Sequence, residues 1–338
     1  MASTLLPLRS IPGRWLVLAL ALGVSALATA QQAAAVAAPD RGVNEWLMRM
    51  QEASRLRSYV GTFVVSSSTG SMSSARIWHA GGATQQIERV EVLSGAPRST
   101  FRRNDEVLTF LPEHHVVRTE RHESLGLFPN LLKSSESSIP EFYAARRLGA
   151  ERVAGFDADL IQLVPKDTLR FGYRVWSEKR TGLVVKLQTL DADGNVLEQA
   201  AFSELQLDSP VRPDKLLHMM QPPRGWRVER AEAVKTTPAA EGWGLHSTVA
   251  GFRPLNCYKR SAAGTSEGGI QWIFSDGLAS VSLFVEPYDR QRHRQEGMFA
   301  SGATQTLTRR IDDWWLTVVG EVPPQTLKAF AQSLERRR

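Results

Sequence analysis

Two stretches of the sequence carry residue types that act as nucleophiles or metal ligands elsewhere, and the first fits the pattern of a hydrolase. Residues 264–268 read Gly-Thr-Ser-Glu-Gly and match G-x-S-x-G, the turn that exposes the nucleophilic serine of α/β hydrolases. That turn needs a strand before it and a helix after it. Here small residues precede the motif and a strand pattern follows it. We therefore expect Ser266 to lie in a hairpin loop and not to act as a nucleophile.

Amino acids of the types that bind metal ions occur near Asp191 and in a group of three histidines. Residues 191–195, Asp-Ala-Asp-Gly-Asn, resemble the start of a calcium loop, but Val196 and Phe202 occupy the positions where an EF-hand needs glycine and glutamate. A hairpin turn explains Asp-Gly better. His114, His115 and His122 are close in sequence, yet successive residues of a strand point to opposite faces. We expect no metal, no cofactor and no enzyme activity.

Large aromatic and aliphatic side chains remain, and they suit binding rather than catalysis. A curved sheet with an open apolar face makes a cleft for acyl chains. We expect the apolar segment 125–143 to cover that face, and the alternative for each residue is ordinary core packing. The predicted lipid-binding groove consists of Trp78, Phe110, Leu125, Phe128, Leu131 and Phe142. Nearby arginines suit phosphate head groups or a solvated strand edge, namely Arg102, Arg103, Arg118, Arg121, Arg146 and Arg147.

A second set of aromatic and basic residues suits a protein partner. Tryptophan and arginine are enriched at the energetic centres of interfaces, and residues 224–227 read Arg-Gly-Trp-Arg. The alternative is strand core for the aromatic residues after position 242 and packing of the linker on a domain for the tryptophan before it. The predicted partner-binding residues are Arg224, Trp226, Arg227, Tyr258, Trp272 and Phe274.

The elements that position these residues are mainly short strands. A helix is predicted from Asn44, where Trp46, Met50 and Ala53 share one face. Short strands separated by turns follow, including a meander over residues 170–199, and they predict a large antiparallel sheet. Residues 125–148 read as loop and short helix. Prolines mark a flexible linker at 219–241, and residues 242–338 predict a smaller α+β domain that ends in a helix from Pro324.

The first thirty residues predict export. A start with Arg9 and Arg14, an apolar run and Ala28-Thr29-Ala30 are the parts of a secretory signal peptide, with an uncleaved anchor as the alternative. Positive and negative charges are interleaved along the rest of the chain, which indicates a solvated surface, and we expect no nucleic-acid partner. Cys257 is the only cysteine, so it makes no internal disulfide and leaves open a cross-linked homodimer or a buried apolar role.

Four stretches resemble the RseB/MucB family of periplasmic regulators: residues 88–113, 160–205, 275–287 and 317–334. The resemblance runs in order through nearly the whole mature chain, although none of the stretches is a catalytic signature. It implies an α+β fold, with an N-terminal antiparallel half-barrel like that of the lipoprotein carrier LolA, covered by helices, and a smaller C-terminal α+β domain. The implied domains are a signal peptide at 1–30, a half-barrel at 31–218, a linker at 219–241 and a partner-binding domain at 242–338.

The resemblance also implies a role in the periplasm. Such a protein binds the periplasmic domain of a membrane-spanning anti-sigma factor of the RseA/MucA kind and shields it from regulated proteolysis. Lipopolysaccharide or mislocalised lipoprotein, through its acyl chains, releases that factor. The alternative is a periplasmic carrier of lipid or lipoprotein that uses the same cleft without a protein client, and a third, weaker reading is an esterase.

Overall fold

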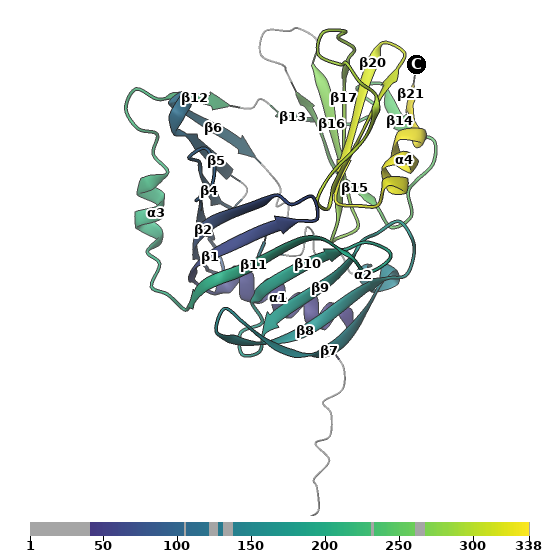
Figure 1. Cartoon of the computed structure of the whole chain (residues 1–338). Helices are drawn as coiled ribbons and strands as arrows, with labels where there is room; N and C mark the ends of the chain where they lie inside the picture. The colour runs from purple at the N-terminus through teal and green to yellow at the C-terminus, as the bar shows by residue number, and fades with distance from the viewer. Residues whose placement is uncertain are drawn as a thin grey trace, which may run out of the picture. The chain divides into compact units, whose positions relative to one another are not determined.

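The computed structural model describes residues 41–104, 106–121, 128–130, 138–230, 233–260 and 268–337. The described part contains two large β-sheets and four α-helices (Figure 1). The predicted signal peptide, Leu125, Leu131, His122 and Ser266 lie outside the described residues.

The first sheet has twelve described strands in the order β12-β6-β5-β4-β3-β2-β1-β11-β10-β9-β8-β7. Its strands pair antiparallel except for β12 and β6, which pair parallel at one edge. It ends at two edges, β12 and β7, and so is open. The strands are Tyr59–Ser67 (β1), Met72–Ala80 (β2), Ile87–Val92 (β3), Ser99–Arg103 (β4), Glu106–Leu111 (β5), Val116–Arg121 (β6), Tyr143–Val153 (β7), Phe156–Pro165 (β8), Gly172–Glu178 (β9), Val184–Leu190 (β10), Val196–Leu207 (β11) and Arg227–Arg230 (β12).

The meander predicted over residues 170–199 is confirmed as β9, β10 and the start of β11. The turn between β10 and β11 is held by Asp191, whose carboxylate accepts the backbone N–H of Asp193 at 3.0 Å and of Asn195 at 2.8 Å. Gly194 takes a φ of 83°, a conformation that glycine adopts without strain. The Asp-Gly sequence is therefore a hairpin turn, as expected.

Helix α1, Val43–Leu56, covers one face of the first sheet. Its buried residues include Trp46, Leu47 and Met50, and they pack against aromatic and branched residues of β7 to β10. In Figure 1 the helix lies behind β8 to β10. The helix confirms the sequence prediction except at its start. Gly42 is the N-cap in place of Asn44, and no side chain caps the helix.

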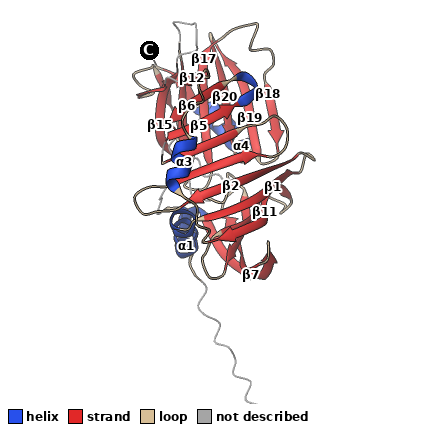
Figure 2. Cartoon of the chain, turned by 90° about the vertical axis from the view of Figure 1, so that its left-hand side faces the viewer, coloured by secondary structure: helices blue, strands red, loops and turns tan. Residues whose placement is uncertain are grey.

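Helix α3, Pro213–Met219, covers the opposite face of the same sheet. Ile77 and Trp78 are successive residues of β2, so they point to opposite faces. Ile77 packs in the cluster that contains Ala53 of α1, whereas Trp78 packs in the cluster that contains Leu216 of α3. Figure 2 shows both helices in blue beside the strands of the first sheet. Both faces of this part of the sheet are thus covered, and the sequence did not predict α3.

The sequence predicted loop and short helix over residues 125–148, but the last part of this segment forms a strand. A short helix, α2, spans Ile139–Phe142, and β7 begins at Tyr143. Residues 143–148 therefore belong to an edge strand and not to a cover.

The second sheet has seven described strands in the order β13-β15-β16-β17-β20-β19-β18. Helix α4, Pro324–Ser333, begins at the predicted proline and packs Leu327 and Phe330 on this sheet. A two-stranded sheet pairs Trp243–Leu245 (β14) with Leu334–Arg336 (β21). The seven strands are Ala233–Thr236 (β13), Arg253–Arg260 (β15), Gly269–Ser275 (β16), Ser280–Pro287 (β17), Gly297–Ser301 (β18), Thr304–Ile311 (β19) and Trp314–Gly320 (β20).

Residues 219–241, predicted as a linker, contribute one edge strand to each sheet. β12 pairs with β6 of the first sheet, and β13 pairs with β15 of the second. This stretch is therefore tied into both sheets at its described strands. The prediction of an α+β fold, with a large open antiparallel sheet followed by a smaller α+β part, is confirmed.

Among the described residues no helix has the length and apolar character needed to cross a membrane. Cys257 is buried in the second sheet, where burial, followed by the charge of Glu241, raises the pKa of its thiol to about 11. A buried thiol held in its protonated form is poorly placed to form a disulfide with a second chain.

Candidate functional site

The residues predicted to form one lipid-binding groove lie in separate clusters. Trp78 and Phe110 pack on the α3 face of the first sheet, together with Phe101. Phe128 packs against the clusters on the α1 face. Because these groups lie on opposite faces of one sheet, they cannot line a single groove, and the predicted set is wrong in that respect.

Phe128 itself lies among aromatic rings. Its ring centroid is 5.4 Å from that of Phe63 and 5.0 Å from that of Phe202. Phe63 and Phe128 are half-buried, whereas Phe202 belongs to the core. Of the residues predicted for the groove, Phe128 thus lies in an apolar group of three aromatic rings. We call these three residues the Phe128 cluster.

Phe142, which was predicted to line the lipid-binding groove, packs against an arginine of the protein itself. The guanidinium carbon of Arg170 lies 4.2 Å from the centroid of its ring. This geometry is that of a cation–π contact, so the face of Phe142 is used within the protein.

The predicted partner-binding residues also divide between the two sheets. Trp226 packs on the first sheet, with its ring centroid 6.2 Å from that of Phe110 and 5.6 Å from that of His115. Trp272 and Phe274 are 9% and 2% exposed and belong to the core under α4. Their alternation along β16 turns both side chains inward, which does not fit an exposed interface.

The remaining residues of that set are accessible in different degrees. Arg224 and Arg227 are exposed, and Arg227 pairs with Glu229 at 2.8 Å. Tyr258 is half-buried on β15. The exposed arginines thus lie on the first sheet's edge strand and the turn before it, and not on the second sheet.

Several of the predicted phosphate-facing arginines already have acidic partners. Arg102 pairs with Glu88 at 2.8 Å, Arg147 with Asp159 at 2.8 Å, and Arg118 with Glu229 at 3.6 Å. Within the described residues no group of three or more histidine, cysteine, aspartate or glutamate side chains is placed to hold a metal ion.

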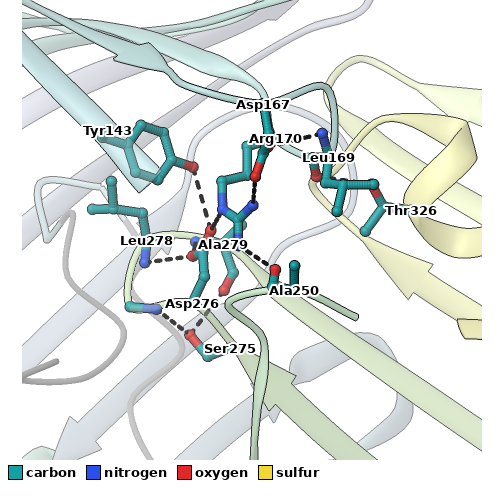
Figure 3. Close-up of polar contacts among 11 residues, drawn as sticks. Tyr143, Asp167, Leu169, Arg170, Ala250, Ser275, Asp276, Leu278, Ala279 and Thr326 are labelled. Carbon is teal, nitrogen blue, oxygen red and sulfur yellow. Dashed lines mark hydrogen bonds and ion pairs between the residues drawn. The ribbon is translucent and has the colours of Figure 1, made fainter. Parts of the chain in front are cut away.

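Sequence reasoning missed a buried ion pair that joins the two sheets (Figure 3). The side chains of Arg170 and Asp276 are both 0% exposed, and Nε of the arginine donates to Oδ2 of the aspartate at 2.7 Å. Arg170 lies in the loop before β9, and Asp276 lies in the turn between β16 and β17. The two residues are 106 positions apart, so no local sequence pattern could relate them.

The charge of Arg170 is satisfied on every side. It also donates to the carboxylate of Asp167 and to the backbone carbonyl of Ala250, the latter at 2.6 Å. Its guanidinium carbon lies 4.9 Å from the ring centroid of Phe252, in addition to the contact with Phe142. Such complete pairing is what makes a buried charge tolerable.

Asp276 is equally well satisfied. Its Oδ1 accepts the backbone N–H groups of Leu278 at 2.9 Å and Ala279 at 2.7 Å, and its Oδ2 accepts the hydroxyl of Tyr143 at 3.4 Å (Figure 3). Burial, followed by the charges of Tyr173 and Asp276, raises the pKa of Tyr143 well above its usual value. Tyr143 therefore remains a hydrogen-bond donor to the aspartate.

Helix α4 adds a further contact to the same loop. The hydroxyl of Thr326 donates to the carbonyl of Leu169 at 2.8 Å, and the amide of Gln325 donates to the carbonyl of Thr168. The loop that carries Arg170 is thus held by the turn before β17, by the segment around Ala250 and by the first turn of α4. We refer to these contacts as the Arg170 cluster.

Comparison with known proteins identifies the family. The model of the MucB/RseB N-terminal domain matches residues 42–220, and that of the MucB/RseB C-terminal domain matches residues 237–335. The chain is 28% identical to the sigma factor AlgU regulatory protein MucB of Pseudomonas aeruginosa over 303 residues, which is 86% of this chain and 90% of that protein. It is 25% identical to the sigma-E factor regulatory protein RseB of Haemophilus influenzae over 334 residues, 98% of this chain and all of that protein.

Solved structures of similar proteins share the fold. The crystal structure of MucB in complex with MucA(peri) is 26% identical, with a TM-score of 0.66, and covers 87% of this chain and 98% of that one. The complex of MucA and MucB from Pseudomonas aeruginosa is 27% identical, also with a TM-score of 0.66, and covers 87% and 99%. The family consists of regulatory binding proteins, which confirms that the chain is not an enzyme.

The Arg170 cluster leads to a stability prediction. Asp276→Ala should lower the free energy of unfolding by about 3–5 kcal/mol, because it leaves a buried guanidinium without its partner. Urea unfolding followed by tryptophan fluorescence measures the change. Asp214→Ala is the matched control, because Asp214 also pairs with an arginine at 2.7 Å but is exposed. The control should leave the unfolding midpoint unchanged, and equal effects of the two substitutions would contradict the prediction.

Proposed function

This chain belongs to the MucB/RseB family, and on that premise we propose that it is a regulator that binds the periplasmic domain of a membrane-spanning anti-sigma factor. The observation that carries the proposal is the similarity to MucB bound to MucA(peri), which extends over 87% of this chain and both matched domains. The family's relatives are named as regulators of sigma factors. The setting of this role is the periplasm, in keeping with the predicted signal peptide.

The finer steps of the role form part of the same proposal. Binding shields the anti-sigma factor from regulated proteolysis, and lipopolysaccharide or mislocalised lipoprotein releases it. The Arg170 cluster supports this, because it ties a loop of the first sheet to the second sheet and to α4. A ligand bound on the first sheet therefore has a physical route to the second, and such coupling typically amounts to about 1–3 kcal/mol.

Two features are proposed as contact sites. The exposed guanidinium groups of Arg224 and Arg227 are placed for an acidic stretch of the partner, since charge complementarity speeds encounter and fixes register. The Phe128 cluster is proposed to meet acyl chains, because half-buried aromatic rings offer apolar surface without leaving the core.

The first test is partner binding by the full mature chain. The Arg224→Glu, Arg227→Glu double variant should bind the anti-sigma factor's periplasmic domain at least about tenfold more weakly, because each substitution reverses a charge at the contact. Isothermal titration calorimetry measures the dissociation constant. Arg212→Glu is the control: Arg212 and Arg227 have 75% and 73% exposed side chains, and each pairs with an acidic residue two positions later.

The outcome separates the regulator from the alternative, a lipid or lipoprotein carrier. If the wild-type chain takes up lipid but does not bind the anti-sigma factor, the carrier is the better description. If the double variant binds as tightly as the control, the arginines are not the contact.

The second test concerns protection. Adding the protein to the anti-sigma factor's periplasmic domain should slow its digestion by a soluble protease, because the bound segment is withdrawn from cleavage. Adding lipopolysaccharide or an acylated lipoprotein should restore the faster rate. Gel densitometry over time gives both rates. Digestion at one rate in all three mixtures would rule out shielding by binding.

The third test concerns acyl chains. Phe128→Asp should weaken binding of an acylated peptide, because it places a charge between two aromatic rings. It should also destabilise the fold by up to about 3–5 kcal/mol, the range for loss of a buried aromatic side chain. Fluorescence titration measures binding, and circular dichroism checks that the variant is folded. Leu93→Asp, at a residue that is 51% exposed, is the control. A folded Phe128→Asp protein with wild-type affinity would remove the Phe128 cluster from the binding site.

A further inference from the structure

A polar pocket of about 370 Å³ lies between the C-terminal half of α1 and strands β2 to β4. It shares no residue with the Arg170 cluster or the Phe128 cluster. Every described residue that lines it has a polar or charged side chain, whereas ordinary ligand pockets are lined mainly by hydrophobic residues. The pocket therefore favours a hydrophilic ligand, and the charges that line it indicate which kind.

Three of the lining residues, His79, Glu88 and Arg102, belong to a row of side chains that lie directly opposite one another on neighbouring strands. Tyr59 extends this row into the core without lining the pocket. Tyr59 on β1 pairs with His79 on β2, His79 with Glu88 on β3, and Glu88 with Arg102 on β4. Because these residues are cross-strand neighbours, their side chains lie on one face of the sheet, the face that α1 covers. The rings of Tyr59 and His79 stack with centroids 4.8 Å apart.

Both carboxylate oxygens of Glu88 already have partners within this row. Glu88 therefore repels an anion in the pocket less than an unpaired carboxylate would. One oxygen accepts from Arg102 at 2.8 Å, and the other accepts from Nδ1 of His79 at 3.2 Å. Burial acts to raise the pKa of Glu88, but Arg102 and His79 outweigh it and hold the pKa at about 2. The carboxylate is thus ionised and occupied, and it keeps Arg102 in place at the edge of the pocket.

Two guanidinium groups remain available to a ligand. Arginine has five N–H donors, and the ion pair between Arg102 and Glu88 engages only part of that set. Arg55, on the last turn of α1, forms no ion pair with an acidic side chain in the part of the chain that the structure describes. With Glu88 neutralised by Arg102, the described lining residues carry one excess positive charge, at Arg55.

Carboxamide groups complete the lining. Gln51, Gln86, Asn104 and Asn130 contribute amide donors and carbonyl acceptors around the two arginines. Such groups hydrogen-bond hydroxyls, which both donate and accept. A volume of 370 Å³ also exceeds what a lone inorganic oxyanion needs and falls in the range of small-molecule sites.

We propose that this pocket binds a phosphate monoester carried on a polar group of about the size of a sugar, with Arg55 and Arg102 contacting the phosphate. Paired N–H donors of arginine match the oxygens of a phosphate, and a phosphate monoester carries about −1.5 to −2 charges at neutral pH. The ester can be a soluble metabolite or the head group of a lipid, because both present the same chemistry. The assignment stands independently of anti-sigma factor binding.

The test uses the full mature chain and three probes. These are inorganic phosphate, glucose 1-phosphate, and phosphatidylcholine vesicles that contain phosphatidylinositol 4-phosphate, whose head group carries a phosphate monoester on a ring of the size of a sugar, with pure phosphatidylcholine vesicles as the blank. Calorimetry or vesicle co-sedimentation measures the affinity. Glucose 1-phosphate should bind more tightly than inorganic phosphate if the ester is soluble, and the phosphatidylinositol 4-phosphate vesicles should bind best if it is a lipid head group.

Two substitutions assign binding to the pocket. Arg55→Gln should weaken binding of the preferred ester by about tenfold, because it removes one charge-assisted contact. Gln51→Glu should weaken it at least as much, because it places a carboxylate in the lining without changing the side chain's size. Neither residue has a buried ion pair to lose, so both variants should fold. Arg41→Gln, at the other end of α1 and outside the pocket, is the control.

Several results would overturn the assignment. They are an absence of binding to all three probes, binding of inorganic phosphate alone, and equal affinities of the two pocket variants and the control. Calorimetry with the anti-sigma factor's periplasmic domain should give the same dissociation constant for Arg55→Gln and the wild type. That measurement keeps a failure of the pocket proposal distinct from a failure of the proposed regulatory function.

Discussion

The ion pair between Arg170 and Asp276 is the constraint on which the arrangement of the two sheets depends. Both side chains are fully buried, so each would carry a large desolvation penalty if it lost the other. The penalty is met only when segments around positions 143, 167, 250 and 276 converge and supply the remaining hydrogen bonds. Other packings of the two sheets would leave one of these charges buried without its partner, and that cost disfavours them. We take this as the reason that one loop joins the two parts of the protein in a defined way.

The first sheet combines two kinds of interior. On one face α1 covers apolar residues of β7 to β10 and, toward β2 to β4, a row of polar residues. On the other face α3 covers a separate apolar cluster. A long open sheet can support such variety because each pair of neighbouring strands builds its own local environment. This division explains why aromatic residues from the same part of the sequence, such as Phe110 and Phe128, pack on different faces of the sheet.

The sequence predicted the elements better than the site. Alternation and turn chemistry located the meander of β9 to β11, the hairpin at Asp191 and the helix from Pro324, because these depend on neighbours in the chain. The family resemblance supplied the order of the two domains. The face on which Trp78 and Phe128 lie depends on strand register and on α3, which no local pattern indicated. Trp272 and Phe274 look suitable for an interface by residue type, yet alternation along β16 buries both. The sequence did not predict the Arg170 cluster or the polar row of β1 to β4, because only tertiary contacts and strand pairing bring their residues together.

The way the chain passes from one sheet to the other limits how far they can move apart. β12 ends at Arg230 in the first sheet, and β13 begins at Ala233 in the second, so only two residues separate them in sequence. A fully extended chain advances at most about 3.3–3.6 Å per residue, which gives this connection a reach of about 10 Å. Any larger separation must first peel β12 from β6 or β13 from β15. Once the ion pair between Arg170 and Asp276 is broken, moving the two strands apart beyond this reach therefore requires an edge strand to fray, so main-chain hydrogen bonds, and not the length of a flexible tether, limit the separation at this point.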